Sequence, residues 1–442
     1  MHLPSPARFL LPIAAAWLSL ALLPAGAQDD LDIFASHSQK QQNGGVRIVS
    51  CDEQVRSQKR GICMNEMSQA DFAALAPGVS WYYNWHYETK YRGISGNIQF
   101  IPMMWGNRPE ALRGLDSTLA SASPKPPVVL CINEPNLKGQ AFITPEQTAN
   151  LYRETKEVTD RYHIPLVGPN MALGSANGDS ITAQDPIENK MVTYNFMVPF
   201  LKATLFYLKP MGITPPALAF HSYGAAGEIK WAVQMMHQTF NCPIWVTEYA
   251  QWKNPDSESA VKYMIESTDF LERTPYVAGY AWFKDRVKDN PNISLLDKES
   301  GKLTQLGETY VTLPAHDSTI YYKIPGQLQA GNYVTAEGAD IRPTADTGGP
   351  YQMAANTSGA TLDYNIQVDS PGAYTLGFRT AGAAGKFDVM ENGQVIGSAQ
   401  SAGGNDWHTV QAAIPLNAGM QKIRVRYNTS GICLHWIEFV RR

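Results

Sequence analysis

Two glutamates stand among polar residues at the ends of apolar runs, where they are well placed for chemistry. Glu134 follows the run 127–132 within Asn-Glu-Pro-Asn, and Glu248 follows the run 243–247 and precedes a tyrosine. Hydrolysis of a glycosidic bond with retention needs two carboxyl groups about 5–5.5 Å apart. The protonated one donates to the leaving oxygen, and the ionised one attacks the anomeric carbon. We therefore take Glu134 and Glu248 as the candidate catalytic pair, although a lone glutamate after a strand is more often an exposed carboxylate.

Polar neighbours of these glutamates strengthen this interpretation. Asn133 can reach the 2-hydroxyl of a sugar, whose hydrogen bonds strengthen in the transition state. Tyr249 could hold a carboxylate in its ionised form, and His221 and Tyr223 could position the second glutamate or the sugar. A buried histidine with satisfied hydrogen bonds is the alternative for His221. The Asn-Glu pair at 65–66 lacks the trailing proline and an evident partner, so we leave it out of the site.

Aromatic side chains gather at the ends of the same apolar runs. The apolar face of a sugar ring stacks on such side chains, which have little conformational entropy to lose. Core packing is the alternative for each of them, but polar neighbours around three tryptophans favour a cleft. The candidate substrate-binding aromatics of this region are Trp81, Trp105, Tyr249, Trp252 and Trp282, the three tryptophans being Trp105, Trp252 and Trp282.

The elements that position these residues form a repeating pattern between residues 46 and 314. Short apolar runs of the kind buried on both faces of a parallel sheet alternate with helical stretches. Eight alternations in this length are typical of a (β/α)8 TIM barrel, whose active site lies at the carboxyl ends of the strands. A doubly wound sheet is the rival, but no glycine-rich loop follows the first run. The eight runs are 61–63, 79–83, 98–104, 127–132, 165–168, 217–220, 243–247 and 277–282.

Helices are predicted between these runs. Ser68 with Asp71 and Thr144 with Gln147 have the spacing of capping boxes, which mark the beginnings of helices. The stretches 191–208 and 257–273 also read as helices.

The chain changes character after a linker predicted at 315–321. Apolar and polar residues then alternate in strands, and Asn392-Gly393 is a strong signal for a two-residue hairpin turn. Regularly spaced strands with turns between them predict an all-β sandwich (jelly-roll) over residues 322–442. The fold class expected is therefore α/β, a (β/α)8 barrel followed by a β-sandwich.

The amino terminus has the features of a secretory signal. Arg8 precedes the apolar run 9–23, and Ala-Gly-Ala ends at residue 27. The run is too short for a spanning helix and is followed by Pro24. We expect a signal peptide at 1–27, a flexible lead-in at 28–45, and a secreted or periplasmic protein.

Charge and cysteine content exclude several classes of function. The formal net charge of −4 gives no electrostatic footprint for nucleic acid or an anionic membrane. Five cysteines are an odd number, and their spacing matches no zinc site. Cys63 and Cys131 lie within apolar runs and are interpreted as core residues. We expect a monomer that uses no cofactor or metal and acts on a neutral polysaccharide.

The segment from Lys59 to about Pro314 resembles glycoside hydrolase family 128, endo-β-1,3-glucanase barrels of the wider group of retaining (β/α)8 enzymes. The resemblance implies that Glu134 is the acid/base, that Glu248 is the nucleophile, and that the substrate is a β-1,3-glucan. The segments that carry it are 79–85, 100–106, 133–136, 220–223, 245–249 and 281–283.

From Tyr322 onward the chain resembles carbohydrate-binding modules of family 6. Trp407 matches one of the family's two sugar-clamping aromatics and is therefore a further candidate for substrate binding. The sequence departs from the family at Gly331, where an acidic ligand of a structural calcium is expected, and at Cys433 or His435, where an asparagine is expected. The matching segments are 324–326, 329–333, 346–349, 372–374, 392–393, Trp407 and 436–439.

These observations predict a retaining glycoside hydrolase that cleaves β-glucan, acting as an endo-β-1,3-glucanase. A hydrolase of another β-glycan (xylan, mannan or galactan) is the nearest alternative. A non-catalytic carbohydrate-binding protein is the second, and the presence of both glutamates argues against it.

Overall fold

A computed structural model describes residues 45–176 and 178–442, which form two compact units. The first unit comprises 58–257 and 275–304, and the second comprises the described part of 42–57 together with 258–274 and 305–442. The predicted signal peptide, 1–27, and all but the last residue of the predicted lead-in, 28–45, lie outside the described residues.

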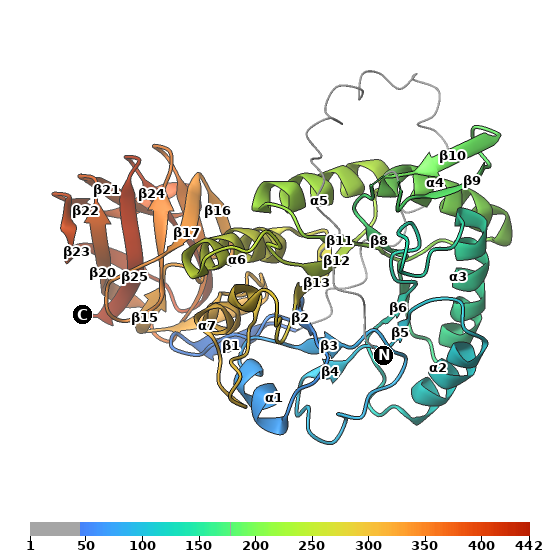
Figure 1. Ribbon diagram of the computed structural model, residues 1–442. Helices are drawn as coiled ribbons and strands as arrows, with labels where there is room; N and C mark the ends of the chain where they lie inside the picture. The colour runs from blue at the N-terminus through green and yellow to red at the C-terminus, as the bar shows by residue number, and fades with distance from the viewer. Residues whose placement is uncertain (1–44, 177) are drawn as a thin grey trace. The chain divides into compact units, whose positions relative to one another are not determined.

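Parallel strands form the centre of the first unit (Figure 1). Seven of them pair in the order β4-β3-β2-β13-β12-β11-β8, and three more pair in the order β5-β6-β7. A parallel bridge between Asn133 and Asn170 links the segment after β6 to β8. The strands are β2 (Arg60–Cys63), β3 (Trp81–Tyr83), β4 (Gln99–Phe100), β5 (Met103–Met104), β6 (Val129–Cys131), β7 (Leu166–Val167), β8 (Asn170–Ala172), β11 (Leu218–Ser222), β12 (Ile244–Tyr249) and β13 (Val277–Phe283).

The predicted α/β class is confirmed, and all eight apolar runs contain strands. Two runs are split: 98–104 into β4 and β5, and the stretch from 165 into β7 and β8. Pro102 and Pro169 stand at the interruptions and cannot donate to a strand ladder. The ladders therefore form two parallel sheets joined by one bridge, and closure into a single barrel stays a prediction.

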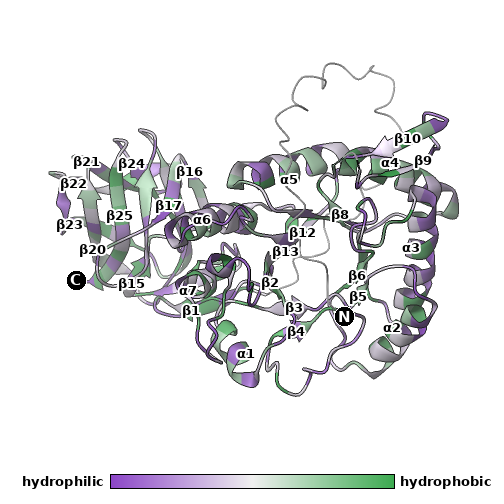
Figure 2. Ribbon diagram, viewed as in Figure 1, coloured by the Kyte–Doolittle hydropathy of each residue, from purple (hydrophilic) through white to green (hydrophobic). Residues whose placement is uncertain are grey.

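Helices connect these strands, and both predicted capping boxes are present. The side chain of Thr144 accepts from the backbone of Gln147, whose side chain accepts in return from the backbone of Thr144. The helices combine hydrophilic and hydrophobic residues, as expected where one face is buried (Figure 2). They are α1 (Gln69–Leu75), α2 (Pro109–Ser121), α3 (Pro145–Asp160), α4 (Met197–Leu208) and α5 (Ala226–Phe240), with the short 3-10 helices η3 (Lys209–Met211) and η4 (Pro291–Ile293).

The predicted helix over 191–208 is only partly correct. Strands β9 (Ile181–Asp185) and β10 (Lys190–Tyr194) form an antiparallel hairpin, and α4 begins only at Met197. Burial alternates along β9, which precedes the predicted helix, and the partner strand β10 takes up the first residues of that prediction. The helix predicted over 257–273 is confirmed as α6 (Ser257–Arg273).

The second unit contains a β-sandwich with α6 and α7 (Gln305–Thr312). One sheet has the order β1-β14-β19-β24-β21-β22, with β16 on β19, and the other has the order β17-β18-β25-β20-β23, with β15 on β25. The rings of Phe378 and Phe387 stack between the sheets, with centroids 5.2 Å apart. The strands are β1 (Arg47–Ser50), β14 (Ile320–Ile324), β15 (Gly326–Gln329), β16 (Thr335–Glu337), β17 (Ala339–Pro343), β18 (Tyr351–Ala355), β19 (Thr361–Val368), β20 (Gly372–Gly382), β21 (Gly385–Glu391), β22 (Gln394–Ser401), β23 (Gly404–Leu416), β24 (Gly419–Tyr427) and β25 (Ile432–Arg441).

Local details of the second unit follow from its sequence. Asn392 and Gly393 have φ values of 50° and 80° and form the turn between β21 and β22, as their dipeptide predicts. The division into units differs from the linear boundaries 46–314, 315–321 and 322–442 that we predicted. β1 pairs with β14, so residues 47–50 belong to a sandwich sheet.

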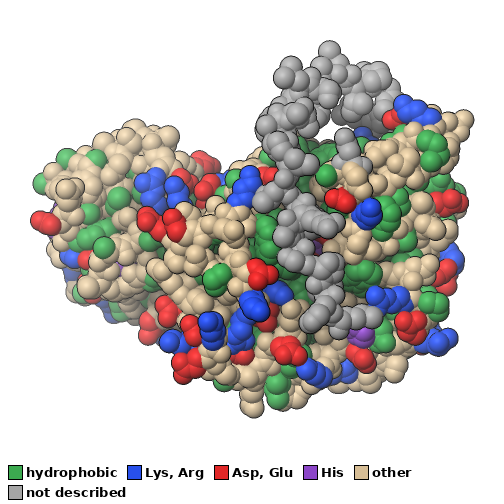
Figure 3. Space-filling view, viewed as in Figure 1, with side chains coloured by type: hydrophobic (Ala, Val, Ile, Leu, Met, Phe, Trp, Pro, Cys, Tyr) green, Lys and Arg blue, Asp and Glu red, His purple; other side chains and the backbone are tan. Residues whose placement is uncertain are grey.

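The described residues carry charges of both signs at the surface, and their cysteines are free thiols. Acidic and basic side chains are interspersed over the face shown in Figure 3. All five cysteines are free, and Cys63 and Cys131 are buried, as their positions in apolar runs predict. Within residues 45–176 and 178–442, no helix has the length and apolar character needed to cross a membrane.

Candidate active site

The structure brings Glu134 and Glu248 together at the carboxyl ends of their strands. Glu134 follows β6, Glu248 lies near the end of β12, and both side chains are about 6% exposed. One oxygen of each carboxylate and a ring nitrogen of His221, on β11, all lie within 4.8 Å of one another. This separation suits a retaining double displacement better than the 6.5–9.5 Å that inversion needs.

Three neutral donors surround the carboxylate of Glu248. Tyr83 donates its hydroxyl to Oε1 at 2.9 Å, and Trp85 donates its indole N–H to the same oxygen at 2.7 Å. Tyr223 donates its hydroxyl to Oε2. These three hydrogen bonds fix the orientation of the Glu248 carboxyl group.

The environment of Glu134 favours its protonated form. Burial is the largest influence and raises the pKa of Glu134, while the hydrogen bond and charge of His221 act in the opposite direction. Nδ1 of His221 lies 2.8 Å from Oε1 of Glu134 and 3.4 Å from Oε2 of Glu248. Burial lowers the pKa of His221, but the two carboxylates outweigh it and the pKa is raised. The raised pKa of Glu134 is the direction that a general acid requires.

Backbone strain accompanies this pair. Glu134 and Trp85 both have left-handed backbones, with φ values of 45° and 58°. Such conformations cost non-glycine residues about 1–3 kcal/mol each and are concentrated at functional sites. The N–H of Glu134 donates to the carbonyl of Asn170 at 2.7 Å, which fixes the strained turn.

A network of buried amide groups supports the turn beneath Glu134. Asn136 exchanges hydrogen bonds of 2.9 and 3.1 Å with the backbone of Ala172. Asn170 donates to the carbonyl of Cys131 at 2.8 Å and accepts from the hydroxyl of Thr247 at 2.9 Å. The network joins the ends of β6, β8 and β12, so it sets the positions from which both glutamates project.

Asn133 is buried beside Glu134. Its Nδ2 donates to Gln140 at 3.1 Å, and its Oδ1 is buried with no hydrogen-bond partner among the described residues. A buried polar atom of this kind can bind a ligand at small cost.

Glu134, His221 and Glu248 also have the spacing of a divalent-cation site, although the donors around Glu248 already use both of its oxygens.

Two of the predicted aromatics lie beside residues of the site. Trp252 packs edge-on against Tyr223 and Phe283, with ring centroids 5.9 and 6.0 Å away. The carbonyl of Trp105 accepts from the N–H of Asn133 at 2.8 Å, and its ring contacts the guanidinium of Arg108. Both tryptophans are partly exposed, as a sugar-stacking side chain must be.

Three predicted residues are placed elsewhere. Trp81 is 3% exposed and packs against Trp245 in the core. Tyr249 and Trp282 are fully buried against each other, and the indole of Trp282 donates to the carbonyl of Ile293 at 2.8 Å. Successive side chains of a strand point to opposite faces, so Tyr249 points away from the site to which Glu248 projects. These three are corrected to core residues.

The sequence interpretation missed three aromatics that take the expected roles. Tyr83 and Trp85 bind Glu248, but neither was among the candidate site residues. Phe283 contacts Trp85, Tyr223 and Trp252 edge-on, at the place that we had given to Trp282. The period of two along β13 could have indicated Phe283, because it separates Trp282 from the side of the sheet that carries the site.

The second unit carries Trp407 in a different setting. Its ring lies edge-on to His435, with centroids 5.6 Å apart. His435 is fully buried, and its Nδ1 lies 2.9 Å from Asp346, which also accepts two hydrogen bonds of 2.8 Å from Arg379. A side chain at Gly331 would press against Pro314 and Ile341, so an acidic residue has little room there.

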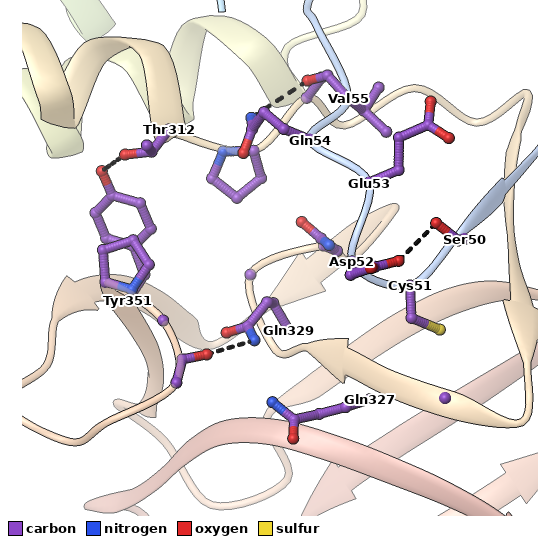
Figure 4. A pocket seen from close by; sticks show the side chains of 18 of the residues that line it. Ser50, Cys51, Asp52, Glu53, Gln54, Val55, Thr312, Gln327, Gln329 and Tyr351 are labelled. Carbon is purple, nitrogen blue, oxygen red and sulfur yellow. Dashed lines mark hydrogen bonds between the residues drawn. The ribbon is translucent and has the colours of Figure 1, made fainter. Parts of the chain in front are cut away.

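The second unit also contains a cavity of about 680 Å³ (Figure 4). Tyr351 bonds Thr312 at 3.0 Å, and the amide of Gln329 donates to the carbonyl of Gly348 at 2.8 Å. Neither glutamate of the pair lines this cavity. These two bonds join α7 to β18 and β15 to the loop before β18.

Comparison with known families agrees with both predicted resemblances. Residues 61–310 match the family model described as glycosyl hydrolase catalytic core, and residues 329–441 match the carbohydrate binding module of family 6. No curated protein matches the chain in sequence.

Solved structures similar to this chain include two family-128 (subgroup II) endo-β-1,3-glucanases. That from Pseudomonas viridiflava has 32% identity and a TM-score of 0.49, and that from Sorangium cellulosum has 26% and 0.48; each covers 59% of this chain and 100% of its own. A subgroup I enzyme from Amycolatopsis mediterranei, in complex with laminaritriose, has 20% identity and a TM-score of 0.45, covering 57% of this chain and 98% of its own. On the family model, which spans more than half of the 442 residues, the chain belongs to the glycosyl hydrolase catalytic core family and is a glycoside hydrolase with a family-6 carbohydrate-binding module.

Proposed function

We propose that the protein is a retaining endo-β-1,3-glucanase, with Glu134 as the acid/base and Glu248 as the nucleophile. The observation that carries the proposal is the contrast between two carboxyl groups that lie within 4.8 Å. Burial raises the pKa of Glu134, while three neutral donors orient Glu248. Asn133, His221, Tyr223, Trp105 and Trp252 remain the proposed substrate-binding or positioning residues, with Trp407 as a candidate in the module.

In the first step, Glu134 protonates the glycosidic oxygen while Glu248 attacks the anomeric carbon. The bond to the leaving oxygen breaks, a glycosyl–carboxylate ester forms on Glu248, and the departing chain carries the proton. The hydrogen bonds from Tyr83, Trp85 and Tyr223 keep Glu248 directed at the anomeric carbon. Asn133 has a free acceptor for a hydroxyl of the same sugar.

In the second step, Glu134 is ionised and takes a proton from water as the water attacks the ester. Glu248 leaves as a carboxylate and regains its three donors. His221 contacts both glutamates and can stabilise whichever of them is charged. Two inversions at the anomeric carbon give net retention.

The choice of β-1,3-glucan rests on the sequence segments that resemble family 128. The carbohydrate-binding module favours a polymeric substrate. Another β-glycan (xylan, mannan or galactan) is the alternative, and it requires the same two carboxyl groups. We further propose that the protein is a monomer and that it is secreted or periplasmic. The location follows because a polysaccharide of this kind lies outside the cell.

Incubation of the mature protein with a panel of glycans tests this function. We expect oligosaccharides of mixed length from soluble and insoluble β-1,3-glucan, because endo cleavage occurs at internal bonds. Cleavage of xylan, mannan or galactan alone would change the substrate assignment. Retention of the protein on a glycan without cleavage of any would favour a non-catalytic binding protein.

A further inference from the structure

The loop after β11 carries Tyr223, and both neighbours of this residue are tied to a single carboxyl group. The hydroxyl of Ser222 donates to Oε1 of Glu228 at 2.9 Å. The backbone N–H of Gly224 donates to the same carboxyl group. Glu228 lies in the first turn of α5. One side chain therefore restrains the backbone on both sides of the tyrosine that binds Glu248.

The residues around Glu228 leave just enough room for its carboxyl group beside the loop. A Cβ atom at position 224 would overlap both carboxylate oxygens of Glu228, so only glycine leaves them in place. Burial raises the pKa of Glu228, while its hydrogen bonds from Ser222 and Gly224 act in the opposite direction, as does the positive end of α5. On the other side of the loop, the carbonyls of Ser222 and Tyr223 each accept a 3.3 Å hydrogen bond from the backbone of residues 250 and 252. The backbone of Tyr223 is thus held from two sides.

We propose that Glu228 is a positioning residue that sets the hydroxyl of Tyr223 against Glu248. The inference rests on the proposed function, because it assigns Glu228 an effect on the nucleophile of that reaction. Glu228 contacts neither carboxylate of the pair in this account and acts only through Tyr223. Its other possible role is to cap α5, which would affect folding and leave the chemistry of the folded enzyme unchanged.

Two single variants disturb this contact by independent routes. Glu228→Gln keeps the size of the side chain but replaces one accepting oxygen with an NH2 group, which cannot accept from Ser222 or Gly224. Gly224→Ala leaves Glu228 intact and displaces its carboxylate. Because Tyr83 and Trp85 still bind Glu248, we expect kcat to fall about tenfold, the equivalent of one hydrogen bond to a charged group, with KM within about twofold of its original value.

The decisive measurement is a double-mutant cycle with Tyr223→Phe. Rates on β-1,3-glucan are measured per folded protein, with melting temperatures recorded for every variant. If Glu228 acts through Tyr223, then Glu228→Gln combined with Tyr223→Phe has the kcat of Tyr223→Phe alone. Glu146→Gln, at an exposed position in the first turn of α3, is the matched control and should leave kcat unchanged.

Each other outcome overturns the inference. If the two losses multiply in the double variant, Glu228 does not act through Tyr223. If Glu228→Gln and Gly224→Ala lower the melting temperature but keep the original kcat, Glu228 only caps the helix. If the unsubstituted protein cleaves no glycan, the proposed function fails and this inference fails with it, whereas an active protein with unchanged kcat in both variants refutes only the role of Glu228.

Discussion

The two units each place a buried histidine against a carboxylate, with an aromatic ring nearby, but the partners of that carboxylate differ. In the first unit, His221 lies beside Glu134, and neutral hydroxyl and indole groups bind Glu248. In the second unit, Asp346 accepts two hydrogen bonds from Arg379 and is also hydrogen-bonded to His435.

As a consequence, the pKa values of Glu134 and Asp346 are shifted in opposite directions. Burial raises the pKa of Glu134, whereas the hydrogen bond from Arg379 is the largest influence on Asp346 and lowers its pKa. A carboxylate paired with a guanidinium is stable and poor at taking up a proton, so it suits a structural role. In the first unit, Glu134 has a raised pKa and can donate a proton, and it lies beside a second carboxyl group that is bound by neutral donors. The comparison shows that burial without a guanidinium partner raises the pKa of a carboxyl group, whereas a guanidinium partner lowers it.

The largest expected effect is on the reactive pair. Glu134→Gln and Glu248→Gln should each fold normally and lose about a hundredfold to ten-thousandfold in kcat, because each removes one half of the double displacement. Asp346→Asn is the comparison variant and should leave hydrolysis of soluble glucan unchanged. Kinetics on soluble β-1,3-glucan check this, and near-normal turnover by either glutamine variant would refute the assignment.

The tryptophans of the first unit should divide into two classes. Trp282→Ala should lower the free energy of unfolding by about 3–5 kcal/mol, because it empties a fully buried site. Trp105→Ala and Trp252→Ala should leave the fold intact and weaken substrate use by about 1 kcal/mol each. Thermal unfolding together with KM measurements separates the classes. A stable Trp282→Ala variant with a raised KM would show that Trp282 binds substrate and is not a core residue.

His221 should control the alkaline limb of the pH profile. The acid form of Glu134 is needed for the first step, so activity is lost as pH rises through its raised pKa. Because His221 lowers that pKa, His221→Asn should move the alkaline limb of kcat/KM to higher pH while reducing the maximum rate. A limb that moves to lower pH would show that another group governs it.

Asp346 should contribute to stability. Asp346→Asn should lower the free energy of unfolding by about 1–2 kcal/mol, because it weakens charged hydrogen bonds from Arg379. The folded-state pKa of Asp346 lies below the value of about 3.9 for an unfolded chain. Its stabilisation is therefore complete above that value and is lost as the pH falls through the folded-state pKa. Asp369→Asn, which removes an exposed partner of Lys323, is the control and should change little. Equal losses from both variants at neutral pH would contradict this contrast.

Trp407 should have the smallest effect. Trp407→Ala in the full chain should leave hydrolysis of soluble glucan unchanged and weaken retention on insoluble β-glucan by about 1 kcal/mol or less. We expect a weak effect because only one of the family's two sugar-clamping aromatics has a counterpart in this sequence. Unchanged retention in a pull-down would show that this module does not use Trp407 to bind glucan.

The sequence was sufficient to identify the candidate site residues that stand at the end of a predicted strand. Glu134, Glu248, His221 and Tyr223 all follow apolar runs, and the carboxyl ends of parallel strands meet at one edge. The eight runs and both capping boxes were equally readable because they depend on local pattern.

Residues whose role depends on side-chain direction were harder to predict. Trp282 and Tyr249 looked functional by composition, but each lies one residue from the side chain that faces the site. Tyr83 sits within an apolar run and resembles a core residue until its hydroxyl is placed beside Glu248. The contact of Glu228 with Ser222 and Gly224 depends on a turn that no sequence pattern specifies.

The stereochemistry of azide rescue tests the central claim most directly. Glu134→Ala with an activated aryl β-glucoside should still form the ester on Glu248, and azide then attacks from the vacated face to give a β-glycosyl azide. In Glu248→Ala, azide should attack opposite the leaving group and give an α-glycosyl azide. The opposite pairing of variants and products would reverse the two roles, and the absence of rescue in both would contradict a double displacement on this pair.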